Sequence, residues 1–167
     1  ERMSQQISYQ LQRASLRKSG LVRHQVRLRP VLQSLCDTLD KVYRDKRVRV
    51  SFALPEQCDV PIEQGALLEL LGNLLENAFK WAERRVLLSV QVEGASSNRR
   101  PGVIFVVDDD GPGIPTEQVE RLLQRGVRGD ERVQGHGIGL AIVRDIVFAY
   151  RGELEVQRSE SLGGAAF

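Results

Sequence analysis

Apolar and polar residues follow one another along this chain in two patterns, one typical of helices and one typical of strands. Apolar residues that recur at intervals of three and four predict helices at residues 31–43, 62–84, 116–124 and 138–149. Alternation and short apolar runs predict strands at residues 47–54, 86–92, 103–107, 154–157 and 165–167. This order of elements predicts an α+β fold, a two-layer α/β sandwich in which a mixed sheet of about five strands packs on about three helices.

The first thirty residues differ from the rest because basic side chains crowd them. Apolar residues within 7–14 recur at helical spacing, and Gly20 and Pro30 interrupt the chain that follows. We therefore predict that residues 1–29 are the end of a long helix and a linker, and that residues 30–167 form one domain. The basic arm either touches phosphate groups or is the solvated face of a helix.

The overall composition is that of a water-soluble globular protein, with 41% hydrophobic and 28% charged residues. No apolar run approaches the roughly 20 residues needed to cross a bilayer. A net charge of +2 is too mild to indicate a nucleic-acid partner, and we expect none. Cys36 on an apolar helix face and Cys58 in a polar loop match no metal-binding motif, so we expect free thiols in a reducing cytoplasm.

The predicted helix at 62–84 carries the most informative polar residues. Asn73, Asn77 and Lys80 follow Glu69 at spacings of four, four and three, so all of them share one face. Asparagine is a poor helix former, and two on one face need a reason. An amide oxygen suits Mg²⁺ beside a triphosphate, and a lysine adds charge for phosphate oxygens. The alternative is a partly exposed polar face on a helix that packs on one side only.

The sequence Asp-Asp-Gly-Pro-Gly at residues 109–113 directly follows the predicted central strand. The carboxylate of Asp109 can accept a hydrogen bond from the amine of adenine, and guanine has no amine at that position. The glycines permit positive φ and a close approach of the backbone to a base. The alternative is an acidic turn before a helix, with Asp110 or Thr116 as the helix cap.

The sequence Gly-His-Gly-Ile-Gly-Leu at residues 135–140 leads from a loop into a helix. Free amides at a helix start attract anions, so this segment is predicted to hold phosphates, although it is neither a Walker A loop nor a Rossmann fingerprint. His136 either meets a phosphate or the metal, or it faces solvent. The preceding glycine-spaced basic loop suits a mobile lid, in which Arg125 or Arg128 would neutralise the γ-phosphate; a solvated loop is the alternative.

Taken together, these motifs and the glycine pair at 163–164 resemble the N, G1, F, G2 and G3 boxes of the sensor histidine kinases, over residues 30–167. Segments 7–14 and 41–43 further resemble one subgroup of these two-component sensors. The resemblance implies the Bergerat fold of the GHKL proteins, binding of ATP and Mg²⁺, and metal ligation by Asn73 and Asn77. It implies catalytic roles for Asn73, Lys80 and Arg128. It also implies that the nucleotide pocket includes Asn77, Trp81, Asp109, Gly111, Gly113, Ile114, Gly135, His136, Gly137, Ile138, Gly139 and Leu140.

The implied activity is that of an ATP-dependent protein-histidine kinase whose catalytic domain lacks the acceptor histidine. In these kinases the acceptor histidine is followed by an acidic residue, whereas His24 is followed by Gln25. The acceptor is therefore expected on an upstream dimerisation domain. Related ATPases activate water with a Glu where this chain has Asn73, which favours transfer over hydrolysis. The implied partners are ATP, the protein's own dimerisation and phosphoacceptor domain, and a response regulator. The intact protein would be a homodimer, with this domain cytoplasmic and the whole an inner-membrane sensor.

Besides the missing acceptor histidine, the sequence departs from the family pattern at two places. Trp81 stands where the family usually has Tyr, and the lid segment has Leu122 and Leu123 where aromatic residues are usual. Three other functions stay open at this point: a related-fold ATPase, an anti-sigma-type serine kinase, and a nucleotide-free interaction module that uses the basic arm.

Overall fold

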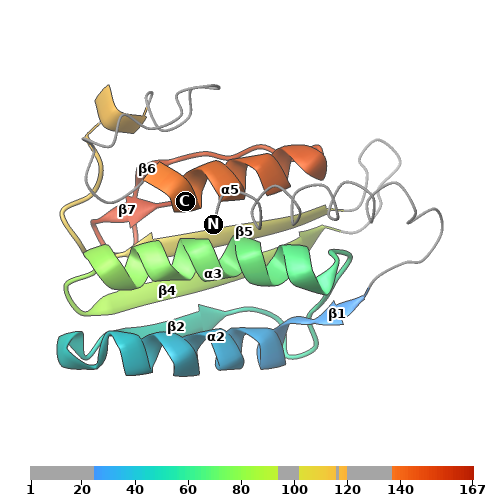
Figure 1. Cartoon of the computed structure of the whole chain (residues 1–167), viewed down its shortest axis with the longest axis horizontal. Coiled ribbons are helices and arrows are strands. Elements are labelled where there is room, and N and C mark those ends of the chain that lie inside the picture. Colours follow the sequence, from blue (N-terminus) through green and yellow to red (C-terminus); the bar gives the residue numbers. More distant parts are fainter. Residues whose placement is uncertain (1–24, 94–101, 116, 120–136) are drawn as a thin grey trace, which may run out of the picture.

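The computed structural model describes residues 25–93, 102–115, 117–119 and 137–167, which build a two-layer α/β sandwich (Figure 1). In this described part, one layer consists of three long helices that lie side by side: α2 (Leu28–Val42), α3 (Gln64–Trp81) and α5 (Gly137–Ala149). The other layer is a five-stranded sheet in the order β2 (Arg49–Ala53), β4 (Arg85–Glu93), β5 (Gly102–Asp109), β7 (Ala165–Ala166) and β6 (Gln157–Arg158). The predicted fold class is confirmed.

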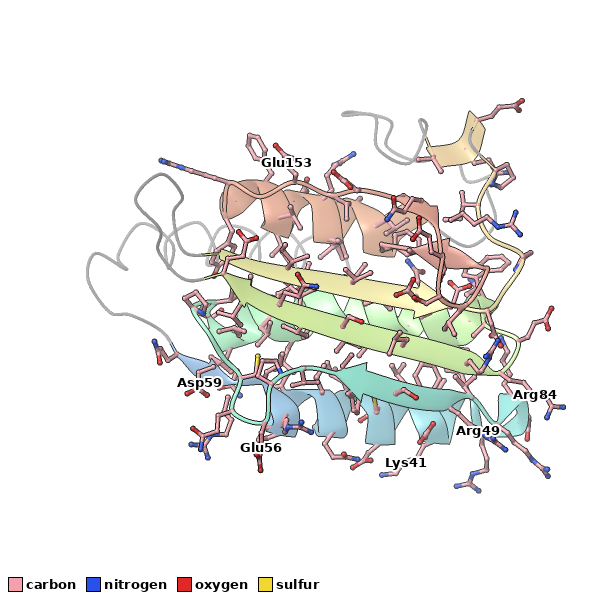
Figure 2. The ribbon with its side chains drawn as sticks, turned by 180° about the vertical axis from the view of Figure 1, so that it is seen from behind. Lys41, Arg49, Glu56, Asp59, Arg84 and Glu153 are labelled. Carbon is pink, nitrogen blue, oxygen red and sulfur yellow. The ribbon has the colours of Figure 1, made fainter. Side chains whose placement is uncertain are left out.

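Smaller features accompany these two layers, and residues 117–119 form a further helical turn. A short ribbon pairs β1 (Val26–Arg27) with β3 (Asp59–Val60), and the 3-10 helix η1 (Arg44–Lys46) follows α2. The sheet is mixed because β2 runs parallel to β4, whereas the other neighbouring strands are antiparallel. Seen from behind, the strands lie in front of the helices, and no described helix covers this face of the sheet (Figure 2).

The β4–β5 hairpin sets the geometry of one edge of the molecule. Side chains of β4 alternate, so Val86, Leu88 and Val90 point into the core that the sheet shares with the helices. The register places Val86 opposite Asp109. Because β4 starts just after α3 ends, this register brings the carboxyl end of β5 next to the carboxyl end of α3.

The central helix, α3, begins and ends at defined residues. The Glu63 carboxylate accepts hydrogen bonds from the amides of Gly65 and Ala66, both at 2.9 Å, and so caps the first turn. At the other end, Ala82 leaves the helical conformation with φ −53° and ψ 142°. The predicted helix at 62–84 is therefore correct in kind and slightly too long. In the described residues, no helix is long and apolar enough to cross a membrane.

The predicted strand at residues 154–157 is mostly wrong. β6 begins only at Gln157, because its partner β7 is short and the pairing starts with Gln157 opposite Ala166. Leu154 packs against the core although its backbone is not part of a strand. The alternation in this segment therefore reports burial and not pairing.

The start of α2 lies ahead of Pro30, which occupies the first turn, where amides have no partner within the helix. Leu28 is fully buried, and Val26 pairs with Val60. The packed fold thus includes positions that the sequence assigns to the linker. The division of the chain into residues 1–29 and 30–167 stays a prediction.

Both cysteines are free and buried. Cys58 lies in the loop before β3, as predicted, but its side chain packs in the core instead of facing polar surroundings, and its carbonyl accepts the Leu28 amide at 2.9 Å. Burial, together with the charge of Asp59, raises the pKa of the Cys58 thiol. Burial and the neighbouring Asp40 and Asp37 raise the pKa of the Cys36 thiol to about 11. Both side chains therefore stay protonated at neutral pH and act as packing groups.

Candidate nucleotide-binding site

The polar face of α3 becomes the wall of a candidate site through three residues that differ in exposure. Asn73 is half-buried, and its Nδ2 donates to the carbonyl of Glu69 at 2.7 Å, one turn earlier in the helix. Asn77 is buried, and Lys80 is exposed. The face thus runs from a buried amide to a solvent-exposed cation at the carboxyl end of the helix.

The side chain of Asn77 stands out because it is buried without full hydrogen bonding. Asn77 is 8% exposed, and its Nδ2 has no hydrogen-bond partner among the described residues. A buried donor without a partner costs about 1–3 kcal/mol. Since an alanine would form the helix better at no such cost, this amide suits contact with an acceptor supplied by a ligand.

The first turn of α5 lies against the same face of α3. A Cβ atom at Gly139 would lie 2.9 Å from the Oδ1 of Asn73, so a side chain there would displace the amide. Gly137 and Ile138 belong to this first turn, and Leu140 anchors it in the core. The amides at the amino end of α5, which favour anions, therefore lie near the asparagine face.

The carboxylate of Asp109 is buried at the end of β5, with 2% of the residue exposed. Its Oδ1 accepts the amide of Gly111 at 2.8 Å and the amide of Ala165 at 3.2 Å. Burial raises the pKa of Asp109, and these two hydrogen bonds only partly offset the effect. A buried carboxylate held in this way is a fixed hydrogen-bond acceptor.

Two glycines allow the chain to approach Asp109 closely. A Cβ at Gly164 would collide with the carboxylate and carbonyl of Asp109, and a Cβ at Gly111 would collide with the carbonyl of Trp81. The turn at 109–113 is therefore wedged between the end of α3 and the segment before β7. The pair at 163–164 stands out in the sequence as a motif, but its contact with Asp109 is visible only in the fold.

Asp110 has a different role from the helix cap considered as an alternative. Its Oδ1 accepts the amides of Arg84 and Arg85, both at 2.9 Å, and its Oδ2 lies 3.4 Å from the Nε of Arg85. Partial burial alone would raise the pKa of Asp110, but the hydrogen bonds from Arg85 and Arg84 outweigh it, so the pKa is lowered. Asp110 thus fixes the chain that leaves α3, and Thr116, the other candidate cap, lies outside the described residues.

The remaining predicted site residues divide into two groups. Trp81 is half-buried at the end of α3, with the Nζ of Lys80 5.6 Å from its ring centroid. Gly113 has φ +78°, which glycine adopts without strain, and Ile114 is half-buried beside it. Arg125, Arg128, Gly135 and His136 lie outside the described residues. The structure thus brings the α3 face, the turn, the α5 start and the glycine pair together, while their roles in binding stay predictions.

Comparison with known proteins defines the class. Residues 62–167 match the family described as histidine kinase-, DNA gyrase B-, and HSP90-like ATPase. This chain belongs to that family and contains its ATP-binding domain.

Its relatives narrow the class further. The chain is 54% identical over 167 residues to the two-component sensor PhoQ of Pseudomonas aeruginosa, with 100% of this chain and 36% of that protein covered. It is 37% identical over 165 residues to the sensor protein PhoQ of Escherichia coli K12, with 98% and 32% covered. The chain therefore spans about a third of the length of these relatives. The subgroup that segments 7–14 and 41–43 resemble is the PhoQ type.

Solved structures establish the same fold. The mycobacterial sensor histidine kinase MprB matches with a TM-score of 0.65 at 24% identity, covering 87% of this chain and 93% of that one. The ATP binding domain of PrrB from Mycobacterium tuberculosis matches with a TM-score of 0.63 at 24% identity, covering 85% and 90%. At these identities the likeness concerns the fold alone.

Proposed function

We propose that this domain binds Mg-ATP and presents the γ-phosphate for transfer to a histidine on a separate dimerisation domain of a two-component sensor histidine kinase. The observation that carries the proposal is the set of close contacts that join α3 to the start of α5, to the turn at 109–113 and, through Asp109, to the glycine pair. These segments are far apart in sequence, and a nucleotide is the ligand that needs all of their chemistries at once.

Magnesium fits the residues present, because Asn73 and Asn77 lie one turn apart on α3 and each offers an amide oxygen, a hard neutral ligand. The Nδ2 of Asn77, which has no partner among the described residues, can donate to a phosphate oxygen. Asn73 and Asn77 would hold the ion through amide oxygens, with the phosphates supplying negative charge. When bound, the ion neutralises charge on the β- and γ-phosphates. Lys80 and Arg128 add positive charge for the same oxygens.

Adenine recognition rests on Asp109. Its carboxylate is fixed by two backbone amides and accepts the exocyclic amine of adenine, whereas the carbonyl of guanine would face it with a second acceptor. Trp81, Gly111, Gly113 and Ile114 provide the surface around the base, and Leu140 closes the wall on the α5 side. The segment 135–139, with His136, Gly137, Ile138 and Gly139, holds the phosphates.

Kinase chemistry is favoured over hydrolysis by the residue at position 73. An amide cannot take a proton from water, and the Asn73 Nδ2 is already engaged with the helix backbone. The site therefore holds ATP without activating water, and the acceptor histidine arrives from the dimerisation domain. In the whole protein, residues 1–29 lead from that domain, the chain forms a homodimer at an inner membrane with this domain in the cytoplasm, and a response regulator receives the phosphoryl group.

Titration calorimetry with Mg-ATP and Mg-GTP tests the binding step. The chain should bind ATP and reject GTP, and Asn77→Ala should weaken binding by about 10- to 100-fold with an unchanged circular dichroism spectrum. Glu76→Ala, at the exposed neighbouring position on the same helix, is the matched control and should bind as the wild type does. Equal affinity for ATP and GTP would rule out Asp109 as the group that selects adenine. Unchanged binding of Mg-ATP by Asn77→Ala would rule out Asn77 as a metal ligand.

Phosphate release distinguishes the kinase from the related-fold ATPase. The chain alone with Mg-ATP should release almost no phosphate, and addition of a dimerisation domain that carries the acceptor should yield an acid-labile phosphohistidine. Steady phosphate release by the chain alone would favour the ATPase. A phosphoserine on a partner would favour the serine kinase.

A further inference from the structure

The carboxyl end of α3 is held by a side chain from outside the nucleotide motifs. Lys46 lies in η1, and its Nζ donates to the carbonyl of Phe79 at 2.9 Å and to the carbonyl of Lys80 at 2.6 Å. These are two of the last carbonyls of α3, which have no partner within the helix. The carbonyl of Ala78 is satisfied separately by the amide of Ala82 at 2.8 Å.

Several features hold η1 in place for this contact. The amide of Lys46 donates to the carbonyl of Tyr43 at 3.0 Å, and Arg47 ends η1 in the left-handed region with φ 50° and ψ 46°. The ring of Tyr43 lies 6.0 Å from the ring of Phe79, which is fully buried. Because a non-glycine residue rarely adopts positive φ, the backbone at Arg47 is a defined local constraint, and it directly follows Lys46.

The helix end that Lys46 holds is also the end that meets the site. Trp81 follows the two carbonyls directly, and its own carbonyl lies against Gly111. On its far side, the amides of Arg84 and Arg85 bind Asp110. A cation at a helix carboxyl end also interacts favourably with the helix dipole. The position of Trp81 and Lys80 relative to the turn at 109–113 thus depends on contacts from both sides, one of which is Lys46.

We infer that Lys46 is a positioning residue of the nucleotide site: its ammonium group holds the end of α3 so that Lys80 and Trp81 meet the turn at 109–113. The inference rests on the proposed nucleotide function, but the placement of Trp81 can be measured without nucleotide. Lys46 itself is not placed in contact with substrate or metal. No motif of the sequence singles it out, because its partners lie 33 and 34 positions further along the chain.

Trp81 is the single tryptophan of the chain, so its fluorescence reports on this helix end directly. Lys46→Met keeps the aliphatic stem and removes the donors. It should shift the emission of Trp81 and increase its quenching by acrylamide in the absence of nucleotide, and should weaken Mg-ATP binding by about five- to tenfold. Lys46→Arg, which restores a cationic donor, should recover most of both. Lys41→Met makes the same change on the outward side of α2 (Figure 2) and should alter neither.

Wild-type emission and quenching of Trp81 in Lys46→Met would overturn the inference, whatever happens to nucleotide affinity. Altered emission with unchanged affinity would also overturn it, because the helix end would then not matter to the site. If the wild-type chain bound no Mg-ATP, the proposed function would fail, and with it the link to the site, while the emission data would still decide whether Lys46 places Trp81. Should Lys46→Met not fold, Lys46→Gln, which keeps one donor group on a shorter stem, is measured in the same way and judged by the same outcomes.

Discussion

The two halves of α3 carry polar residues of different kinds. The first half is capped by Glu63 and buries Leu67, Leu70 and Leu71 in the core shared with the sheet. The second half contains Asn73 and Asn77, one of them buried with an amide donor that has no partner among the described residues. The second half also buries Leu74, Leu75 and Phe79, so the difference lies in the asparagines: only the second half carries a polar group that is unfavourable in the free chain.

This difference shows how stability and binding are divided along the helix. The apolar half stabilises the fold whether or not a ligand is bound. The polar half carries a desolvation cost that a bound nucleotide and metal would relieve, so its contribution appears only in the complex. Substitution of a buried leucine should therefore change the free energy of unfolding of the free chain, whereas substitution of Asn77 should change the response to ligand.

The largest expected effect comes from a buried leucine in the first half of α3. Leu71→Ala removes a fully buried side chain and should lower the free energy of unfolding by about 3 kcal/mol, through lost burial and the cavity left behind. Leu68→Ala, on the same stretch of helix but 37% exposed, is the matched control and should change it by no more than about 0.5 kcal/mol. Urea unfolding measures both. Equal losses in the two variants would show that burial of side chains on α3 does not determine the stability of the free chain.

The next effect concerns ligand-induced stability in the polar half. At a nucleotide concentration about 100 times the dissociation constant, Mg-ATP should stabilise the wild-type chain by about 2.7 kcal/mol. Asn77→Ala should unfold at nearly the wild-type temperature without ligand, because it removes a buried amide donor that has no partner among the described residues, and should show almost no shift with Mg-ATP. Thermal unfolding with and without nucleotide measures this. A large loss of stability in ligand-free Asn77→Ala would mean that Asn77 supports packing.

Local signals in the sequence predicted both the apolar and the polar residues of α3. The leucine periodicity gave the helix and its buried side, because burial of apolar area dominates the folding of such a helix. The asparagines were recognisable because they contradict helix propensity, which is a local signal. The strand predicted at 154–157 was mostly wrong, because alternation reports which side chains are buried. It carries no information on whether a partner strand is within reach.

Contacts between distant segments could not be read from the sequence. Asp110 could be read as a helix cap, but its partners are the amides of Arg84 and Arg85, 26 and 25 positions earlier. The contact between Gly164 and Asp109 likewise depends on the pairing of β5 with β7. Side-chain chemistry identifies candidate groups, whereas the register of the sheet decides which of them meet.

A smaller effect is expected from the residue that fixes the exit from α3. Asp110→Asn keeps an oxygen acceptor but removes its charge, and should lower the free energy of unfolding by about 1–2 kcal/mol at neutral pH. Since the folded-state pKa of Asp110 lies below the ordinary 3.8, its contribution is complete above that value and is lost as the pH falls through the lowered pKa. The variant should therefore lose less stability on acidification than the wild type. Urea unfolding across the acid range tests this, and an unchanged acid dependence would contradict it.

The smallest effect lies at the start of the helix, where Glu63 occupies a capping position more often filled by Ser, Thr, Asp or Asn. Glu63→Ala removes the acceptor for the amides of Gly65 and Ala66 and should lower the free energy of unfolding by about 1 kcal/mol. Glu63→Asp keeps a carboxylate at the cap and should retain most of the stability. Both variants should bind Mg-ATP as the wild type does, because the cap lies at the opposite end of α3 from Lys80 and Trp81. Weaker nucleotide binding by Glu63→Ala at full folding would show that the two halves of the helix are coupled, and the separation of stability from binding along α3 would then be wrong.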